Sequence, residues 1–226
     1  KKQAAKNGRR DSNYEFGTNP CSEIILRPNQ FCNLTEVVVR ATDDLDSLTE
    51  KVRLATILGT IQSSFTKFPY LRKIWQKNTE EERLLGVSLT GIMDNKLMTL
   101  KNKGLAQTLD HLKTVAVVTN AEWADKLGIP RATAISCVKP SGTVSQLVDS
   151  ASGIHARHSP YYIRTVRGDT KDPITQFMKD QGIPSEPCAM KPDTTVVFSF
   201  PQKAPTGAVV TADMSAIEQL EMWLAY

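Results

Sequence analysis

The sequence predicts an α/β fold with mostly parallel strands, and three observations support this prediction. Short β-branched runs, of which Glu36–Val39 is the clearest, indicate buried strands. Longer amphipathic segments, such as 105–127, separate these runs along the chain. The 226 residues are 40% apolar and 23% charged, so the chain is long and apolar enough to bury a core.

The first elements are a loop, a strand and a helix. We expect a structured loop over 17–34, because prolines interrupt its short apolar run. A strand over 36–39 follows. The next segment, from about 45 to 65, carries apolar residues at three- and four-residue steps and predicts a helix, which Pro69 stops.

The middle of the chain continues the alternation. A helix is predicted over 71–84, and its acidic run 80–82 is expected to be solvated surface. A glycine-bearing strand is predicted over 85–90. The long amphipathic helix over 105–127 should end at Gly128, a C′ glycine.

The last third begins with a buried strand over 132–138. A loop follows it and opens a short helix that ends at Val148. The remaining predicted elements are strands over 161–166 and 194–200 and helices over 173–181 and 215–226.

Charge and apolar content narrow the class of protein. The chain has 28 Lys and Arg against 24 Asp and Glu. The net charge of +4 is too small to indicate nucleic-acid binding unless the cations cluster. They cluster only at the start, in a basic opening that predicts a solvated or frayed terminus. The residues of this basic opening are Lys1, Lys2, Lys6, Arg9 and Arg10. No run approaches the ~18 to 20 apolar residues of a membrane span, and no secretory signal follows the start, so we expect a soluble, cytoplasmic protein.

The chain has four cysteines, Cys21, Cys32, Cys137 and Cys188. They lack CxxC or Cys/His spacing, which argues against a zinc site or a disulfide scaffold and leaves catalytic thiols open. The chain has no initiator Met, and its last helix lacks a C-cap signal, so we expect a fragment of a longer protein.

The first motif with chemical content lies in the loop over 17–34. Cys21 has an amide, Asn19, two residues before it and a carboxylate, Glu23, two residues after it, and Cys32 follows eleven residues later. Extended chain alternates faces, so the thiol and its two flanking groups would point to one side, as a reactive sulfur, a general base and a hydrogen-bonding amide. A loop cysteine with two polar neighbours by chance is the alternative.

The second motif is the run Pro140–Ser145, which follows a strand and starts a helix. Free backbone N–H groups, small residues and the hydroxyls of Ser141 and Thr143 make a plausible phosphate cradle. It is not a Walker loop, since no Lys-Ser/Thr ends it. Ser141 fits equally well as a simple N-cap. A thiol with a base and a separate phosphate cradle suggests redox or radical chemistry on a nucleotide.

Both motifs resemble signatures of the ribonucleotide reductases. Asn19–Glu23 resembles their Asn-x-Cys-x-Glu active-site signature, and Pro140–Thr143 resembles their substrate phosphate-binding loop. Two further runs, 85–91 and 152–155, and the short interval between the first two cysteines resemble the adenosylcobalamin-dependent branch. Within that branch the resemblance is to the monomeric type that reduces ribonucleoside triphosphates.

The resemblance implies a role for each matching residue. Cys21 would form the transient thiyl radical that removes the 3′-hydrogen of the ribose. Glu23 would take the proton of the 3′-hydroxyl, and Asn19 would orient the sugar hydroxyls. Cys32 would be one of two cysteines that supply reducing equivalents as the 2′-hydroxyl leaves as water. The implied substrate-binding residues are Ser22, Ser141, Gly142, Thr143 and Val144.

The resemblance also implies a fold and partners. The family fold is a ten-stranded α/β barrel of two halves, with the catalytic cysteine on a central finger loop. Residues 1–226 would be a partial catalytic barrel domain, with the finger loop at 17–34 and a strand, phosphate loop and helix at 132–150. The N-terminal half-barrel, with the redox partner of Cys32, and the C-terminal shuttle cysteines would be missing. The implied partners are a ribonucleotide, adenosylcobalamin, the missing half as a separate or cropped chain and a thioredoxin-like reductant, with a phage genome as one candidate source.

Two other functions stay open. The chain could be a non-catalytic nucleotide-binding or assembly module that works only with a complementary half. It could also be an enzyme in which Cys21 is an ionic nucleophile, although no histidine lies within the Cys21 loop.

The remaining cysteines and the tryptophans are assigned to packing. Cys137 and Cys188 lie where the family motifs name no residue. The tryptophans Trp75, Trp123 and Trp223 fall on predicted helices and are expected in the core.

The last candidates are two pairs of charged or titratable residues. His155 and His158 are expected to be structural or surface histidines. Arg164 and Arg167 fit contact with a triphosphate and a solvated strand edge equally well.

Overall fold

The computed structural model describes residues 4, 8 and 10–226. Most of the basic opening lies outside the described residues, namely Lys1, Lys2, Lys6 and Arg9. Arg10 is described and only 8% exposed, because its guanidinium forms an ion pair with Glu82. The prediction of a solvated or frayed terminus is therefore wrong for Arg10.

A parallel sheet forms the centre of the larger part of the molecule. β3 (Asn33–Val38) pairs in parallel with β4 (Leu85–Thr90). The segment 132–138 runs along the other edge of β4, where the N–H of Cys137 donates to the carbonyl of Val87 at 3.1 Å. This segment forms an isolated parallel bridge rather than a full strand, so the predicted strand is present only as extended chain.

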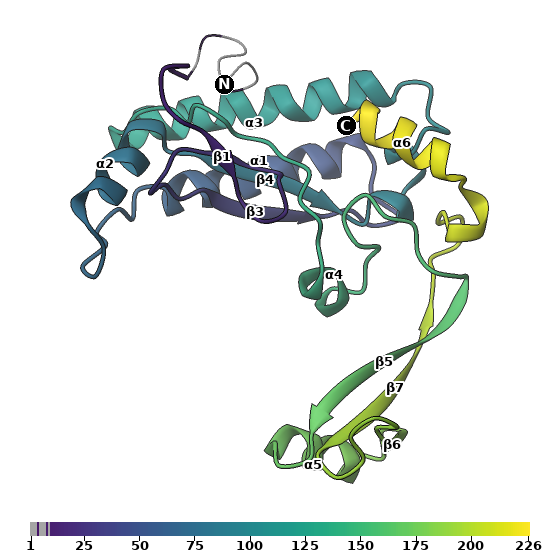
Figure 1. Cartoon of the computed structure of the whole chain (residues 1–226). Helices are drawn as coiled ribbons and strands as arrows, with labels where there is room; N and C mark the ends of the chain where they lie inside the picture. The colour runs from purple at the N-terminus through teal and green to yellow at the C-terminus, as the bar shows by residue number, and fades with distance from the viewer. Residues whose placement is uncertain (1–3, 5–7, 9) are drawn as a thin grey trace.

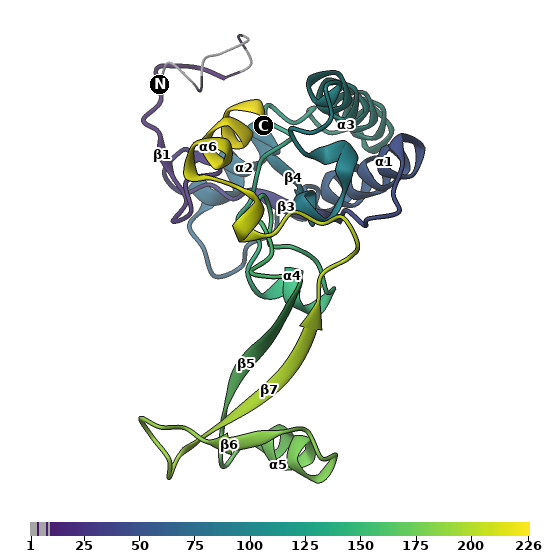
Figure 2. The ribbon, with the colours of Figure 1, turned by 90° about the vertical axis from the view of Figure 1, so that its right-hand side faces the viewer.

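Two long helices, α1 (Leu45–Gln62) and α3 (Leu105–Leu127), lie side by side against this sheet (Figures 1 and 2). The buried apolar residues of the two helices and of the strands form one core. Leu48, Leu112 and Val87 are almost fully buried in this core. The predicted α/β architecture is confirmed for this part of the chain. Burying such side chains supplies the main stabilisation of the sheet and helices, about 1.5 to 3 kcal/mol each.

The helix boundaries follow local signals. α1 starts after Asp44, whose carboxylate accepts from the N–H of Ser47 in a capping box. It ends at Gln62 rather than at the predicted residue 65, and α2 (Lys73–Glu82) is shorter than predicted at both ends. α3 has the predicted bounds, and Gly128 follows it in the left-handed conformation, with φ of 65°.

Residues 161–203 project from this body as an arm (Figures 1 and 2). β5 (Tyr161–Asp169) pairs antiparallel with β7 (Thr195–Lys203), which also pairs antiparallel with β6 (Ser185–Pro187). α5 (Pro173–Asp180) lies at the far end of this arm. The prediction of mostly parallel strands is therefore wrong here. β5 is exposed over most of its length, and antiparallel sheets tolerate such exposure where parallel ones do not.

Short elements complete the described chain. They are β1 (Gly17–Thr18), β2 (Ile25–Leu26), η2 (Ile92–Asp94), η3 (Lys96–Met98), α4 (Thr143–Leu147), η4 (Thr211–Asp213) and α6 (Ala216–Ala225). α6 packs against the body through Met222, and the hydroxyl of Tyr226 donates to the carbonyl of Met98 at 2.8 Å. None of the helices in the described part of the chain is long and apolar enough to cross a membrane.

Two predictions about buried residues are wrong. Trp223 is 63% exposed, and Trp75 and Trp123 are only half-buried, so the tryptophans do not form the core. The acidic run 80–82 is not uniformly solvated, because Glu82 is 1% exposed. Its carboxylate faces two arginines of the N-terminal segment rather than water.

Candidate active site

Cys21 lies at the tip of a hairpin formed by β1 and β2. The N–H of Ser22 donates to the carbonyl of Asn19 at 2.9 Å, and the N–H of Ile24 donates to the Asn19 side chain at 3.1 Å. Ser22 has a φ of 63°, which is the left-handed region. The prediction that extended chain turns Asn19, Cys21 and Glu23 to one side is therefore wrong in its reason, because the segment is a tight turn.

This turn gives its side chains different environments. Cys21 and Ser22 are exposed, whereas Asn19 and Glu23 are half-buried. The side-chain oxygen of Asn19 is used inside the turn, so its amide nitrogen is the atom left to donate. One carboxylate oxygen of Glu23 is buried without a hydrogen-bond partner among the described residues. A buried carboxylate oxygen of this kind is suited to accept a proton or hydrogen bond from a ligand.

Two further thiols lie below the hairpin. Burial raises the pKa of Cys32 to about 12, with smaller contributions from Cys137 and from the charge of Glu23. Burial also raises the pKa of Cys137 to about 12, and Glu23 adds to this shift. The negative charge of Glu23 thus contributes to the pKa of both thiols. Each of them stays a neutral S–H at physiological pH, which suits transfer of a hydrogen atom rather than ionic attack.

Gly86 makes room where the hairpin meets the sheet. A Cβ at this position would lie 3.2 Å from the sulfur of Cys137 and 3.2 Å from Ile24 of the hairpin, and it would overlap the side chain of Leu34 on β3. The hairpin thus covers the face of the sheet on which Cys137 lies. Cys137 packs as predicted, but no pattern in the sequence indicates that the hairpin covers it. The described cavity beside the hairpin has a volume of about 340 Å³ and is lined by Glu23, Ile24 and Ile25 among others.

The predicted phosphate loop lies at the start of α4. Ser141 is 1% exposed, and its hydroxyl accepts from the N–H of Ser145 at 3.1 Å. The N-cap of α4 is Gly142, so Ser141 is not the N-cap itself, although its hydroxyl bonds to the first turn from the position before the cap. Gly142, Thr143 and Val144 are exposed, so their backbone N–H groups and the Thr143 hydroxyl are accessible to a ligand.

The phosphate loop is attached to the same sheet as the hairpin. The N–H of Lys139 donates to the hydroxyl of Ser88 on β4 at 2.9 Å. Behind the loop, Gly153 has a φ of 54°, and a Cβ there would lie 2.8 Å from the carbonyl of Lys139. The N–H of Gly153 donates to Thr90 at 2.9 Å. The segment 152–155 therefore supports the loop from below.

A buried ion pair between Arg157 and Asp94 holds the chain that follows the phosphate loop. Arg157 is 4% exposed and contacts both oxygens of Asp94, at 2.8 and 2.9 Å. The second Asp94 oxygen also accepts from the N–H of Ala151 at 2.8 Å. Burial lowers the pKa of Arg157, but the hydrogen bonds and charges of Asp94 and Asp149 outweigh it and raise the pKa overall, so the guanidinium stays charged.

The weaker candidates do not join the site. His155 and His158 are exposed, as expected of surface histidines. Arg164 and Arg167 are exposed on the arm. The backbone N–H groups of Met190 and Lys191, and to a smaller extent Arg167, lower the pKa of Cys188. Among the described residues, no three His, Cys, Asp or Glu side chains are grouped to hold a metal ion.

Comparison with curated proteins gives a consistent group of relatives. The adenosylcobalamin-dependent ribonucleoside-triphosphate reductase of Lactobacillus gasseri is 30% identical over 214 residues, covering 83% of this chain and 28% of the relative. The Euglena gracilis protein of the same name is 27% identical over 216 residues, covering 92% of this chain and 28% of the relative. The chain thus spans little more than a quarter of the length of these relatives. No family model matches the chain.

A solved structure supports the same comparison. A crystal structure of a B12-dependent (class II) ribonucleotide reductase matches with a TM-score of 0.78 and 26% identity. The match covers 95% of this chain and 33% of that one. Both the body and the arm are therefore included in the similarity.

Proposed function

This chain is homologous to a portion of the adenosylcobalamin-dependent ribonucleoside-triphosphate reductases, and we propose that it carries the catalytic hairpin of such an enzyme. The proposed reaction is the radical reduction of ribonucleoside triphosphates to 2′-deoxyribonucleotides. One observation carries the proposal. Glu23, with an unpartnered buried oxygen, belongs to a hairpin that packs over the sheet face of Cys137 and exposes Cys21 at its tip.

Each residue of the hairpin has a role in this proposal. Cys21, as a thiyl radical, removes the 3′-hydrogen of the ribose, and its exposed position suits contact with a substrate. Glu23 accepts the proton of the 3′-hydroxyl with its free oxygen. Asn19 and Ser22 hold the sugar by hydrogen bonds. The exposed groups of Gly142, Thr143 and Val144 bind the phosphates, while Ser141 shapes that loop from inside.

Cys32 supplies reducing equivalents as the 2′-hydroxyl leaves as water. Two electrons are needed, so a second thiol must form a disulfide with it. Cys137 is badly placed for this, because β4 separates the two segments, and two strand spacings put their Cα atoms about 10 Å apart or more. A disulfide needs roughly 4.4 to 6.8 Å. We therefore propose that the partner thiol comes from the missing barrel half, and that a thioredoxin-like reductant restores the pair.

The cofactor of the relatives is adenosylcobalamin, which supplies a radical by homolysis of its cobalt–carbon bond. The exposed thiol of Cys21 suits exchange of a hydrogen atom with a group bound outside the hairpin. The best-formed cavities of the described residues have volumes of about 330 to 440 Å³, at the small end of the ~300 to 1,000 Å³ of drug-sized sites. We assign no residue of this portion to holding the cofactor.

The ten-stranded barrel with a central finger loop is part of the same proposal. The parallel pair β3 and β4 with the segment 132–138 would be adjacent barrel positions. The hairpin over one face of this sheet would be the finger loop. Residues 1–226 are then a partial barrel domain, and activity needs the half-barrel that this chain does not contain.

The two alternatives have less support. A purely non-catalytic module is not favoured, because the relatives are named as enzymes. An ionic Cys21 nucleophile would need a base such as histidine nearby. The three histidines make their contacts elsewhere: His111 with Thr49 on α1, His155 with Ser152 and His158 with Tyr162.

The test is Cys21→Ser in the assembled reductase, with Cys188→Ser, on the distant arm, as the matched control. We expect Cys21→Ser to lose both nucleotide reduction and cobalt–carbon homolysis while it still binds the nucleotide. Cys188→Ser should keep all three properties. Reduction that persists in Cys21→Ser would show that the radical assignment is wrong.

A further inference from the structure

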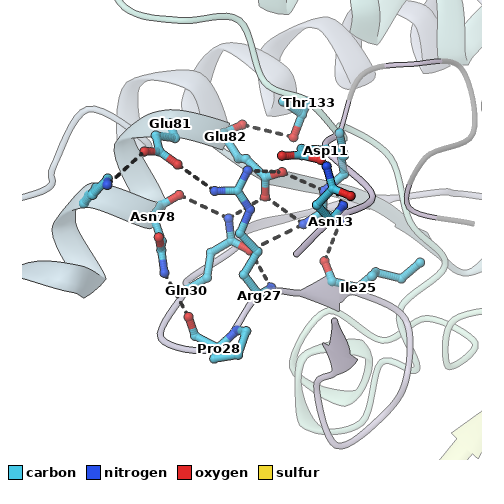
Figure 3. Close-up of polar contacts among 12 residues, drawn as sticks. Asp11, Asn13, Ile25, Arg27, Pro28, Gln30, Asn78, Glu81, Glu82 and Thr133 are labelled. Atoms are coloured by element: carbon cyan, nitrogen blue, oxygen red, sulfur yellow. Dashed lines mark hydrogen bonds and ion pairs between the residues drawn. The ribbon is translucent and has the colours of Figure 1, made fainter. Parts of the chain in front are cut away.

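A buried ion network lies at the base of the hairpin (Figure 3). Arg10 comes from the chain before β1, and Arg27 comes directly after β2. Both guanidiniums meet Glu82, the last residue of α2. The two ends of the hairpin are therefore joined through one carboxylate.

The carboxylate of Glu82 is fully used. Arg10 donates to its two oxygens at 2.9 and 2.7 Å, and Arg27 approaches one of them at 3.0 Å. The side chain of Gln30 donates to it at 2.6 Å. The side chains of Arg10, Arg27 and Glu82 are only 5%, 6% and 2% exposed. Burial by itself would raise the pKa of Glu82, but the hydrogen bonds from Arg10 and Gln30 and the charges of both arginines lower it overall.

The arginines also contact the hairpin directly. Arg10 donates to the carbonyl of Ile25 on β2 at 2.8 Å, and its guanidinium lies 4.7 Å from the ring centre of Phe16. Arg27 lies 3.7 Å from the ring centre of Tyr14. The chain that leads into β1 and the strand β2 thus each contact at least one guanidinium that is paired with Glu82.

On its other side, Glu82 belongs to the body of the protein. Its backbone carbonyl accepts from the N–H of Thr133 at 3.0 Å, and β4 begins three residues after it. Gln30 also donates to the carbonyl of Asn78 on α2 at 3.1 Å. Glu82 therefore connects the hairpin to the sheet that carries the phosphate loop.

Charge balance makes this carboxylate essential to the arrangement. Two buried guanidiniums face Glu82. Glu81, whose side chain is 37% exposed, contacts Arg27 at 2.7 Å and Lys77 at 3.9 Å, but it does not contact Arg10. Without the negative charge of Glu82, Arg10 has no carboxylate partner among residues 10–226. Leaving a buried charge unpaired is strongly unfavourable, so the hairpin would move to release the arginines into water.

We propose that Glu82 is a positioning residue that sets the place of the Cys21 hairpin relative to the sheet. The assignment of chemistry to Cys21 and Glu23 rests on the proposed function, whereas the coupling of the hairpin to Glu82 does not. Misplacement of a reacting group by ~1 Å can cost on the order of 100-fold in rate. We call the contacts of Arg10 and Arg27 with Glu82 the clamp. Loss of the clamp should lower turnover more than nucleotide affinity, because the phosphate loop is held by other contacts.

The experiment compares Glu82→Gln with Glu81→Gln, the same change at the neighbouring position. Hydrogen exchange is followed in peptides covering the hairpin and, as an internal reference, α3. The amides of Ser22 and Ile24 report on the turn, since both are hydrogen-bonded within it. Turnover and KM for the nucleotide are measured on the assembled reductase.

For Glu82→Gln we expect hairpin exchange to rise about tenfold or more with α3 unchanged, and kcat to fall on the order of 100-fold with KM within about twofold of wild type. Glu81→Gln should stay near wild type. Unchanged hairpin exchange in Glu82→Gln, or equal effects of both variants, would overturn the proposal. If Glu82→Gln does not fold, Arg10→Lys keeps the charge but loses the two-pronged contact, and the same selective loosening is expected at smaller size.

The two proposals can fail separately. An assembled wild-type protein that does not reduce ribonucleotides refutes the proposed function, while the exchange measurement needs no substrate and still tests the clamp. A wild-type enzyme that is active, with a Glu82→Gln variant equally active and equally protected, refutes the clamp alone.

Discussion

The support of the phosphate loop by Gly153 can be tested with Gly153→Ala. Gly153 combines a φ of 54° with close contact to the loop. A Cβ there would lie 2.8 Å from the carbonyl of Lys139 and 3.3 Å from the backbone nitrogen of Ser141. Both neighbours are backbone atoms, which cannot rotate away as a side chain can. An added methyl group must therefore displace the loop, the turn of Gly153 or both.

The size of the effect follows from two contributions. An L-residue in the left-handed region costs about 1 to 2 kcal/mol, and overpacking of a tight site costs about 1 to 3 kcal/mol. Gly128→Ala is the matched control, because Gly128 has a φ of 65° but no atom within 4 Å of the added methyl. We expect the free energy of unfolding to fall by about 1 to 2 kcal/mol in Gly128→Ala and by about 2 to 5 kcal/mol in Gly153→Ala.

The assays are denaturant unfolding of both variants and equilibrium binding of a nucleoside triphosphate. A displaced loop should weaken binding in Gly153→Ala by about tenfold, which corresponds to roughly 1.4 kcal/mol. Gly128→Ala should bind as wild type, since Gly128 only ends α3. Equal stability losses in the two variants, or unchanged binding in Gly153→Ala, would refute the role given to Gly153.

Two further predictions concern ionisation. At pH 8, a thiol-alkylating reagent should label the exposed Cys21 before Cys32 and Cys137, since a pKa of about 12 leaves roughly one molecule in ten thousand as thiolate at these two residues; rapid labelling of Cys32 in the folded protein would contradict this. The pKa of Glu82 is below its usual 4.5 in the folded state, so its contribution to stability is present above that pH and is lost as the pH falls through the folded value. Unfolding measured from pH 6 down to pH 3 should show a smaller acid-induced loss in Glu82→Gln, and identical pH profiles of the variant and wild type would show that Glu82 is not the group responsible.

Strong local patterns predicted much of the body. The bounds of α3 and β4 agree with the prediction, because a long amphipathic period and a C′ glycine act within a few residues of each other. The hairpin was missed as a hairpin, since its strands are two residues long and show no alternation. The antiparallel arm was also missed, because pairing direction depends on partners far apart in the sequence.

The candidate site shows the same division. Asn19, Cys21, Glu23 and Cys32 could be selected from residue type and spacing, and their catalytic roles stay predictions. Their arrangement could not be derived, because a left-handed turn at Ser22 replaced the expected extended chain. In the sequence, Glu82 is only one of three consecutive glutamates.

By itself, the sequence determined the α/β class of the body, the helices and the residue types that chemistry requires, since these depend on periodicity and motif within short windows. Only the tertiary structure decided which of the glutamates is buried and which thiols share a face of the sheet. Burial and charge pairing join Arg10 to Glu82 across 72 positions of sequence. Contacts at that separation depend on how the elements pack, and no local pattern records them.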